Sequence, residues 1–316
     1  MLDISVIIAT YNRAAVLEET LRAFCELDTD GMSWELVVVD NNCSDRTKTV
    51  IESFGDRLPI RYLFEPRQGK NVALNTALEV ADGGLLVFAD DDITPSKGWL
   101  AAYKVGTQEY SGFSAYGGPV EDTFEGGCPE WVLSGIKGVC EFSSDVAKGW
   151  PEDNQEFGCN MNPLGANMAI PRKTIYSSGL RFNDSIGPRG QGRIAGSETE
   201  LLLRIRRNGG RLFHLKDVKV LHRIPKELQS PEYLRKRAMW FGRGFARITG
   251  FTPLPTIAGV PRFLIRMVPV LCAKMCVCYI LRNRGGYFNN QLRMLKCAAI
   301  AAEYWRGNGS WLPAEG

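Results

Sequence analysis

The stretch Val87-Phe-Ala-Asp-Asp-Asp-Ile-Thr-Pro95 runs from an apolar strand directly into three adjacent aspartates. Like charges this close repel one another, so a positive group should neutralise them if all three are ionised near pH 7. Side chains alternate faces along extended backbone, so Asp90 and Asp92 should point one way and Asp91 the other. The stretch therefore predicts a charged site at the end of a buried strand.

The residues before this stretch alternate short apolar runs with helical patterns. Strands are predicted at 4–9, 34–39, 60–64 and 85–88, and helices lie between them, two of these at 44–54 and 71–80. Continuous apolar strands joined by helices indicate a parallel sheet that is covered on both faces. Ligands bind at the carboxyl ends of such strands, so Thr10–Arg13, Asp40–Asn42 and Asp90–Asp92 should face one crevice.

The remainder of the chain is less regular at first and then helical. Residues 111–165 are rich in Gly, Pro and Trp, which suggests loops over a mixed sheet. Helices are predicted at 197–207 and 231–248, with a strand at 218–221.

The composition is that of a globular chain. Its 316 residues, 45% hydrophobic and 23% charged, suit one large or two modest domains. Nine cysteines, an odd number with no C-x-x-C pair, favour a reducing cytosol over a disulfide framework. No basic segment precedes the first strand, so a signal peptide is not expected and the predicted location is cytoplasmic.

A series of motifs resembles family 2 glycosyltransferases in content and order, from about Ile4 to His222. The motifs are Ile4-Ser-Val-Ile-Ile-Ala-Thr-Tyr-Asn-Arg13, Val38-Val-Asp-Asn-Asn-Cys-Ser-Asp45, Gly69-Lys-Asn-Val-Ala-Leu-Asn75, Asp90-Asp-Asp92, Gly165-Ala-Asn167 and Gly196-Ser-Glu-Thr-Glu-Leu201. The resemblance implies an α/β fold of the GT-A nucleotide-diphospho-sugar transferase type, a Rossmann-like mixed sheet flanked by helices. It also implies a divalent cation and inversion at the anomeric carbon.

This resemblance suggests a division of the chain. Residues 1–222 are expected to form the GT-A catalytic domain, with 1–110 as its nucleotide-binding half and 111–222 as its acceptor-binding half. Residues 223–316 are expected to form a basic, amphipathic helical extension.

The aspartate triplet is the predicted cation site. Carboxylate oxygens suit Mn²⁺ or Mg²⁺, which one or two carboxylates and substrate phosphates typically hold. The family pattern assigns Asp92 to the metal and places Asp90 near the ribose. His222 follows a predicted strand, where several branches of the family carry a metal-binding histidine; a purely structural histidine is the alternative. The alternative for the triplet is a solvated acidic turn.

The nucleotide is expected to be uridine, because Asp40 can accept a hydrogen bond from the N3–H of uracil. Asn41-Asn42-Cys43 departs from the family's commoner Asp-Asp-Gly/Ser form, and helix capping is the alternative around Ser44 and Asp45. The glycine before the 71–80 helix brings cationic and amide groups to phosphate or sugar oxygens. The predicted nucleotide-binding residues are Thr10, Tyr11, Asn12, Arg13, Asp40, Asn42, Arg67, Lys70, Asn71, Asp90 and Asp91.

Glu198 takes the place of the family's catalytic aspartate when the motif is aligned on Gly196 and Thr199. An acceptor hydroxyl is too weak an acid to ionise alone, so a carboxylate base is needed there. The alternative is an acidic first turn that favours the helix dipole. Glu200, Trp131 and Asn167 are expected to contact the acceptor, although core packing would also account for the tryptophan.

The C-terminal part is strongly basic. Arg223–Gly316 holds 15 Lys and Arg against four Asp and Glu, a net charge of +11, whereas the preceding residues carry −8. Gly259–Leu281 is apolar but interrupted by cations, which favours a helix lying on an anionic membrane surface over a spanning one. Packing on the catalytic domain is the alternative. No nucleic-acid motif accompanies the basic residues, so nucleic acid is not an expected partner.

The function predicted from these features is a metal-dependent inverting glycosyltransferase. It would move a sugar from a UDP-sugar to a glycan or lipid-linked acceptor in surface polysaccharide or glycoconjugate synthesis, peripherally at the inner face of the cell membrane. The alternative is an inactive nucleotide-sugar-binding module. A dinucleotide oxidoreductase is disfavoured because no G-x-G-x-x-G follows the first strand.

Overall fold

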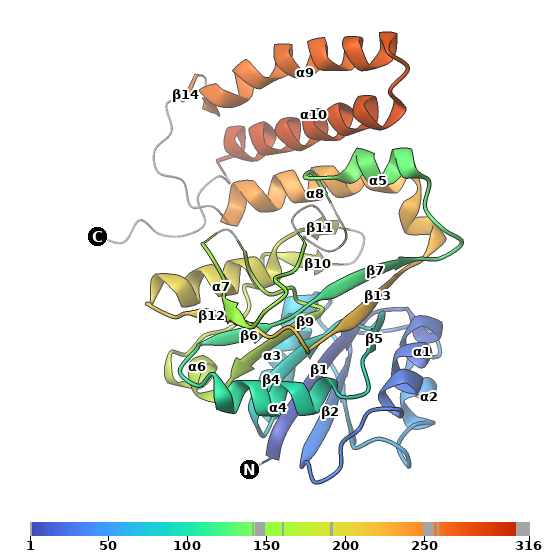
Figure 1. Ribbon diagram of the computed structural model, residues 1–316, viewed down its shortest axis with the longest axis vertical. Coiled ribbons are helices and arrows are strands. Elements are labelled where there is room, and N and C mark those ends of the chain that lie inside the picture. Colours follow the sequence, from blue (N-terminus) through green and yellow to red (C-terminus); the bar gives the residue numbers. More distant parts are fainter. Residues whose placement is uncertain are drawn as a thin grey trace. The chain divides into compact units, whose positions relative to one another are not determined.

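The computed structural model describes residues 2–140, 142, 149–159, 161–189, 192–248, 256–257 and 259–307. The chain divides into two compact units (Figure 1). Unit 1 comprises Met1–Thr123, Gly149–Gly192 and Ser197–Arg223, and unit 2 comprises Phe124–Lys148, Arg193–Gly196 and Ile224–Gly316.

Unit 1 is built on an eight-stranded mixed sheet with the order β3-β2-β1-β4-β9-β6-β12-β8. Its first half is parallel, as predicted, and consists of β1 (Leu2–Thr10), β2 (Trp34–Asp40), β3 (Ile60–Phe64) and β4 (Gly83–Ala89). Antiparallel pairing of β9 with β4 makes the sheet mixed. The remaining strands are β9 (Asn167–Pro171), β6 (Ala115–Gly117), β12 (Leu212–His214) and β8 (Gln155–Glu156).

Helices cover both faces of this sheet because its strands are apolar on both sides. Ile4, Val6 and Ile8 of β1 pack in one cluster, whereas Ile7 packs in another on the opposite face. The first cluster receives α1 (Ala14–Phe24), α2 (Thr47–Glu52) and α4 (Trp99–Glu109). The second receives α3 (Lys70–Val80), α6 (Arg172–Ser177) and α7 (Ser197–Arg207). The predicted fold class is thereby confirmed.

A three-stranded sheet with the order β5-β13-β7 lies after the aspartate triplet. Its strands are β5 (Ile93–Pro95), β13 (Val220–Ile224) and β7 (Val120–Phe124). The strand predicted at 218–221 therefore begins two residues later, and His222 lies within it. Antiparallel pairing places His222 opposite Ile93, the residue that follows the triplet. A hairpin of β10 (Gly187–Arg189) with β11 (Gly192–Ile194) forms a further small sheet.

Unit 2 is mainly helical. It contains α5 (Glu130–Ile136), the 3₁₀ turn Lys226–Gln229, α8 (Pro231–Ile248), α9 (Arg262–Ile280) and α10 (Arg284–Trp305), with short strands β14 (Thr256–Ile257) and β15 (Val260–Pro261). Helix α10 contacts α5, α8 and α9. Helices α8 and α10 approach closely at Gly242, where a Cβ atom would lie 2.4 Å from the Lys296 carbonyl oxygen.

A buried carboxylate also joins α8 to α10. Glu303 is fully buried, and its two oxygens accept hydrogen bonds from Arg243 at 3.0 Å and Arg247 at 2.8 Å. Trp131 of α5 meets the Phe288 ring edge-on at 5.5 Å between centroids and lies under the Arg284 guanidinium. Trp131 therefore packs within unit 2, as the alternative interpretation of this residue expects. Its contact with an acceptor stays a prediction.

Asn167 requires a correction, because its side chain is a structural anchor of unit 1. It is fully buried at the start of β9. Its Oδ1 accepts hydrogen bonds from Trp99 Nε1 at 2.9 Å and Tyr103 Oη at 2.8 Å, and its Nδ2 donates to the carbonyls of Pro119 at 3.1 Å and Val218 at 2.6 Å. All four hydrogen-bonding positions are occupied within the protein, so none is left for an acceptor sugar.

Replacing Asn167 with Ala should lower the free energy of unfolding by at least about 3 kcal/mol, because several buried polar groups lose their partner at once. Urea unfolding followed by circular dichroism measures the change. Asn208→Ala, at an exposed asparagine, is the matched control and should stay within about 0.5 kcal/mol of the parent chain. Equal stability of the two variants would show that the network around Asn167 is not stabilising.

Candidate active site

The carboxyl ends of β1, β2 and β4 lie side by side, as the sequence predicts. Thr10 is the register partner of Asp40, and Ile8 is the partner of Ala89, one residue before the triplet. The loop after β1 carries Arg13 and the segment after β4 carries the aspartates. Charged side chains from separate strands are therefore brought to one edge of the sheet.

Arg13 neutralises two of the three aspartates. Its Nη1 donates to Asp91 Oδ1 at 2.5 Å and its Nη2 to Asp92 Oδ2 at 2.9 Å, while Thr10 Oγ1 donates to Asp91 Oδ2 at 2.7 Å. Lys70, at the first turn of α3, forms an ion pair with Asp90. The cations that the triplet requires come from the β1–α1 loop and from α3.

The expected alternation of the triplet is wrong, because Asp91 and Asp92 share one guanidinium. Strand β4 ends at Ala89 and the chain turns at Asp91 and Asp92, so the backbone is no longer extended there. Burial raises the pKa of the Asp91 carboxyl against the pull of Arg13. Burial would lower the pKa of Arg13, but Asp91 and Asp92 together raise it.

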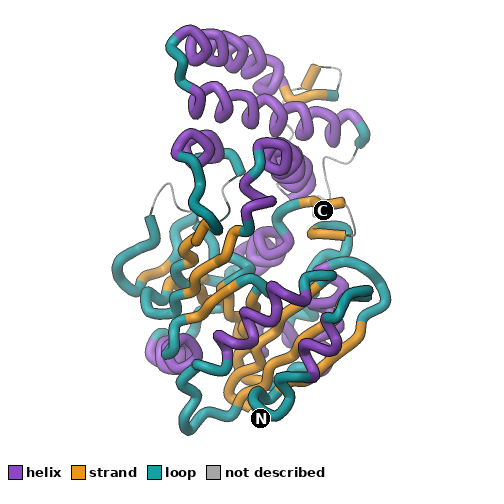
Figure 2. Tube along the Cα trace, turned by 90° about the vertical axis from the view of Figure 1, so that its right-hand side faces the viewer, coloured by secondary structure: helices purple, strands orange, loops and turns teal. Residues whose placement is uncertain are grey.

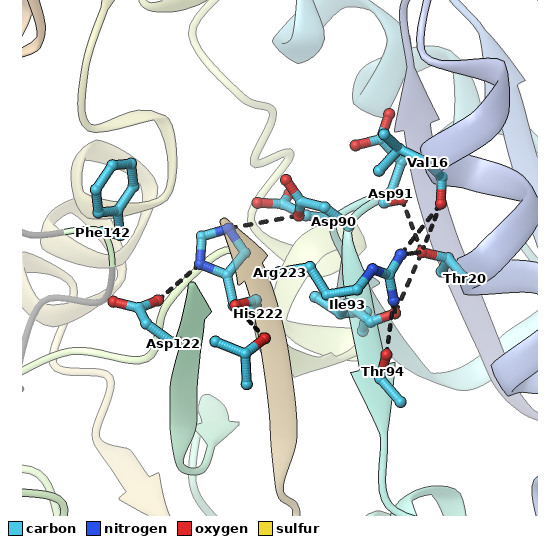
Figure 3. Close-up of polar contacts among 12 residues, drawn as sticks. Val16, Thr20, Asp90, Asp91, Ile93, Thr94, Asp122, Phe142, His222 and Arg223 are labelled. Atoms are coloured by element: carbon cyan, nitrogen blue, oxygen red, sulfur yellow. Dashed lines mark hydrogen bonds and ion pairs between the residues drawn. The ribbon is translucent and has the colours of Figure 1, made fainter. Parts of the chain in front are cut away.

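His222 supplies the third positive group. Its Nδ1 lies 2.9 Å from Asp122 Oδ1 and its Nε2 lies 3.5 Å from Asp92 Oδ1. Figure 3 shows the ring between Asp122 on one side and the aspartates on the other. Burial lowers the pKa of His222, but the facing carboxylates of Asp122 and Asp92 outweigh it and raise the pKa to about 9. Burial works against ionisation of Asp92, yet His222 and Arg13 hold its pKa well below the usual value.

Arg223, next to His222, fastens the site to α1 and β5. Its side chain donates to the Ile93 carbonyl at 2.7 Å, to Thr94 Oγ1 at 2.6 Å and to Thr20 Oγ1 at 2.7 Å, and its backbone N–H donates to the Asp92 carbonyl at 2.9 Å (Figure 3). Burial lowers the pKa of Arg223. Sequence reasoning missed Arg223 and Asp122, because their partners lie about 100 or more residues away.

The residues around His222 fit a divalent cation. Asp92 Oδ1 is buried without a hydrogen-bond partner and faces the imidazole Nε2. Carboxylate oxygen and neutral imidazole nitrogen are both ligands for Mn²⁺-type ions, so a cation bound here would replace the Nε2 proton of His222 and the positive charge that it carries. A carboxylate on the opposite ring nitrogen is the usual support for a metal-binding histidine. Within the described ranges no group of three or more His, Cys, Asp or Glu forms a metal site, so further ligands would come from the substrate.

Asp40 and the loop after β1 frame a neighbouring position. Asp40 is buried; its Oδ1 accepts from the Cys43 N–H at 2.8 Å and its Oδ2 from Tyr62 Oη at 3.1 Å. Tyr11 is exposed. Asn12 and Asn42 both adopt positive φ, 49° and 63°, which asparagine tolerates better than most residues.

The capping alternative holds for Asp45. Its Oδ2 accepts from the first N–H of α1, that of Ala14, at 3.0 Å, and its Oδ1 accepts from the first N–H of α2, that of Thr47, at 3.0 Å. One carboxylate therefore satisfies the beginnings of two helices. Partial desolvation raises the pKa of Asp45, but the hydrogen bonds from Thr47 and Ala14 outweigh it and lower the pKa.

The Gly69 turn is held by an asparagine that sequence reasoning did not single out. Asn41 Oδ1 accepts from the Gly69 N–H at 2.7 Å, and its Nδ2 donates to the Arg67 carbonyl at 2.8 Å. Arg67 is exposed and paired with Glu65, and hydrogen bonding to Arg67 lowers the pKa of Glu65 to about 2. Asn71 is buried and donates to the Asn183 carbonyl at 2.7 Å.

The two glutamates of α7 have different surroundings. Glu200 is buried, and Arg204 donates to both of its oxygens at 2.7 and 2.8 Å. Arg204 also donates to the Arg181 carbonyl, so Glu200 supports α7, and its contact with an acceptor stays a prediction. Glu198 is half-buried beside Gly165 and forms no hydrogen bond or ion pair with another described residue. Its carboxylate is therefore available to a substrate.

Residues 5–103 match the family model described as glycosyl transferase family 2. Over this segment the chain is similar to that family. It is 35% identical over 127 residues to glycosyltransferase AglE of Haloferax volcanii, covering 39% of this chain and 41% of the relative. It is also 35% identical over 95 residues to the GalNAc(5)-diNAcBac-PP-undecaprenol beta-1,3-glucosyltransferase of Campylobacter jejuni, covering 29% of this chain and 30% of the relative. The chain spans less than half the length of these curated relatives.

Solved structures show the same fold. A mannosyltransferase of Pyrobaculum calidifontis in complex with GDP-Man and Mn²⁺ superposes with a TM-score of 0.55 at 22% identity, covering 99% of this chain and 79% of that chain. Residues 1–349 of Staphylococcus aureus TarS in complex with UDP-GlcNAc superpose with a TM-score of 0.55 at 16% identity, covering 97% of this chain and 92% of that chain. These likenesses confirm the GT-A-type fold of this chain.

Replacing Arg13 with Met should lower the free energy of unfolding by about 3–5 kcal/mol, because a buried carboxylate loses its cation. The double variant Arg13→Met/Asp91→Asn should recover part of the loss, since the neutral amide no longer requires a cation. Urea unfolding measures both. Arg22→Met removes an exposed ion pair and should cost about 0.5 kcal/mol or less. Equal losses in the Arg13 and Arg22 variants would show that Arg13 does not stabilise the triplet.

Proposed function

We propose that this chain is a metal-dependent inverting glycosyltransferase that moves a sugar from a nucleotide-diphospho-sugar to a hydroxyl group of a glycan or lipid-linked acceptor. The observation that carries the proposal is the facing pair of Asp92 Oδ1 and His222 Nε2, 3.5 Å apart at the end of β4. Asp92 lies in the segment that matches the family 2 model, and both residues lie in a fold whose solved members include nucleotide-sugar complexes.

Asp92 and His222 are the proposed protein ligands of Mn²⁺ or Mg²⁺. When bound, such an ion supplies positive charge to a leaving nucleoside diphosphate. Asp122 fixes the ring of His222, and Arg223 fixes the strand that carries it. Asp90 stays paired with Lys70, which places a second cationic group at the same strand end.

UDP is the proposed nucleotide. Asp40 ends β2 beside Thr10, and each of its carboxylate oxygens keeps a lone pair beyond the bonds from Cys43 and Tyr62. The N3–H of uracil is a suitable donor to it. The TarS structure holds UDP-GlcNAc, whereas the Pyrobaculum enzyme holds GDP-Man, so the fold accommodates either base and Asp40 is the residue that favours uracil here.

Glu198 is the proposed general base. The acceptor oxygen attacks the anomeric carbon from the face opposite the diphosphate, its proton passes to the Glu198 carboxylate, and the bond between that carbon and the diphosphate oxygen breaks. Attack from the opposite face inverts the configuration. Glu198 is available for this step because it forms no hydrogen bond or ion pair with another described residue. Glu200, in contrast, is held by Arg204.

A curated relative supports the proposed acceptor class. The Campylobacter jejuni relative is by its name a transferase to an undecaprenol-linked glycan. We assign this chain a glycan or lipid-linked acceptor of similar kind, used at the cytoplasmic face of a membrane in surface polysaccharide or glycoconjugate synthesis.

Replacing Asp92 with Asn should abolish the Mn²⁺-dependent part of UDP binding, because the amide removes the charge that holds the cation. Asp122→Asn should weaken that part by about 10- to 100-fold, the usual effect of losing the group that orients a metal-binding histidine. Isothermal titration with UDP, with and without Mn²⁺, measures both effects.

Asp217→Asn is the matched control, because Asp217 is exposed and lies outside the site. Its UDP titration should equal that of the parent chain. Unchanged Mn²⁺-dependent binding in a folded Asp92 variant would remove Asp92 from the cation site.

Replacing Glu198 with Gln should reduce glycosyl transfer by about 10²- to 10⁴-fold while leaving donor affinity unchanged, because the amide cannot accept the acceptor's proton. Nucleotide release with a verified acceptor measures turnover, and titration with UDP measures binding. Normal turnover in this variant would place the base elsewhere. Donor binding without turnover in the parent chain, across a panel of nucleotide-sugars and acceptors, would favour the inactive binding module.

A further inference from the structure

Helix α9 leaves most of its apolar side chains outside the core of unit 2. It is 19 residues long, and its most apolar window has a mean hydropathy of 1.9, yet only 11% of that window is buried. The exposed large apolar residues of α9 and the turn after it are Phe263, Ile265, Val268, Val270, Val277, Tyr279, Ile280 and Leu281. Exposing this much apolar surface to water is unfavourable in free energy, so such a surface marks an interaction site.

Only one narrow stripe of α9 packs against the protein. Leu264, Met267, Leu271, Met275 and Cys278 are buried or half-buried and recur at helical spacing. Leu264 and Leu271 share a cluster with Cys297 and Ile300 of α10. Figures 1 and 2 both show α9 and α10 side by side. Outside this stripe, Tyr279 meets the Tyr287 ring of α10 at 6.4 Å between centroids, and the other large apolar residues of α9 are exposed.

The charge around α9 has one sign. Residues 262–302 contain seven Lys and Arg and no Asp or Glu. Arg262, Arg266 and Lys274 are exposed on α9 itself, and Arg282 follows in the turn. An exposed apolar face beside cations without counter-charges matches a lipid surface with anionic headgroups.

We propose that α9 lies in the plane of a lipid bilayer that contains anionic lipids, with its outer face among the acyl chains. Val270, Val277 and Ile280 enter the bilayer. Arg262, Arg266 and Lys274 lie on the same side of α9 at helical spacing, so their apolar stems run beside these residues and carry the charged ends back to the phosphates.

The attachment of α9 to α10 argues against a spanning helix. A 19-residue helix is about 28 Å long, close to the thickness of the hydrocarbon core, so length alone would allow it to span. However, α10 packs beside α9, and Glu303 of α10 is paired with Arg243 and Arg247 of α8. Spanning would draw these charged groups into hydrocarbon or strip α9 from its partner. Lying in the plane requires neither.

The charge of α9 also disfavours a second copy of this chain as the occupant. Two α9 helices face to face would bring Arg262, Arg266 and Lys274 of each copy together without acidic partners. Like charges in such a contact repel. An anionic membrane converts the same cations into favourable contacts.

Co-sedimentation of the full-length chain with vesicles tests the proposal. The chain should bind phosphatidylcholine vesicles that contain phosphatidylglycerol more tightly than vesicles of phosphatidylcholine alone. The variant Val277→Asp/Ile280→Asp should lose about tenfold or more in partitioning, because two apolar groups become charged. Both positions are well exposed, at 53% and 75%, so the fold of unit 2 does not depend on them.

Val105→Asp is the matched control, since Val105 is 60% exposed on a helix of unit 1, and its vesicle binding should equal that of the parent chain. Arg262→Gln/Lys274→Gln should lower binding to the anionic vesicles by about fivefold per charge and leave binding to neutral vesicles unchanged. Melting temperatures confirm that each variant is folded. If Val277→Asp/Ile280→Asp is not folded, the vesicle binding of Arg262→Gln/Lys274→Gln decides the test.

Equal vesicle binding by the parent chain, the α9 variants and Val105→Asp would overturn the proposal. A change from dimer to monomer in the α9 variants, seen by light scattering without any vesicle binding, would assign the face to a second copy instead. The proposal does not rest on the transferase activity, because vesicle binding requires neither donor nor cation. Failure of one therefore leaves the other standing.

Discussion

The site depends on compensating three adjacent carboxylates at the end of one strand. Asp91 and Asp92 are almost completely buried, where an unpaired charge would cost several kcal/mol. Arg13 bridges the two, Lys70 pairs with Asp90, and His222 faces Asp92. These cations come from the β1–α1 loop, α3 and β13, so the charges balance only when the sheet has assembled.

The same charge balance holds His222 in place and leaves one buried oxygen of Asp92 for the proposed cation. Asp122 and Arg223 fix His222 and its strand, which leaves Asp92 Oδ1 without a hydrogen bond although it is buried. A buried polar atom without a partner is normally costly, and such atoms concentrate where a ligand completes the site. The proposed cation and diphosphate would supply what the protein leaves unsatisfied.

Unit 2 is stabilised by helix packing and leaves one helix largely exposed. Its core is formed by α5, α8 and α10, and the buried Glu303 ties α8 to α10. Helix α9 adds a narrow buried stripe and a wide apolar exterior. The proposed catalytic chemistry at the sheet edge and the proposed attachment to a lipid surface thus use separate groups of residues, which would suit an enzyme whose acceptor is held at a membrane.

Sequence periodicity by itself determined the parallel half of the sheet and its helices. Helices at 197–207 and 231–248 appear with the predicted bounds, because apolar spacing reports the buried face directly. The placement of Arg13, Lys70 and the aspartates at one edge followed from strand order. Tertiary structure alone decided the rest. Asp122 and Arg223 act through partners about 100 or more residues away, and Asn167 is satisfied by side chains and carbonyls distant in the sequence, which no local pattern reveals.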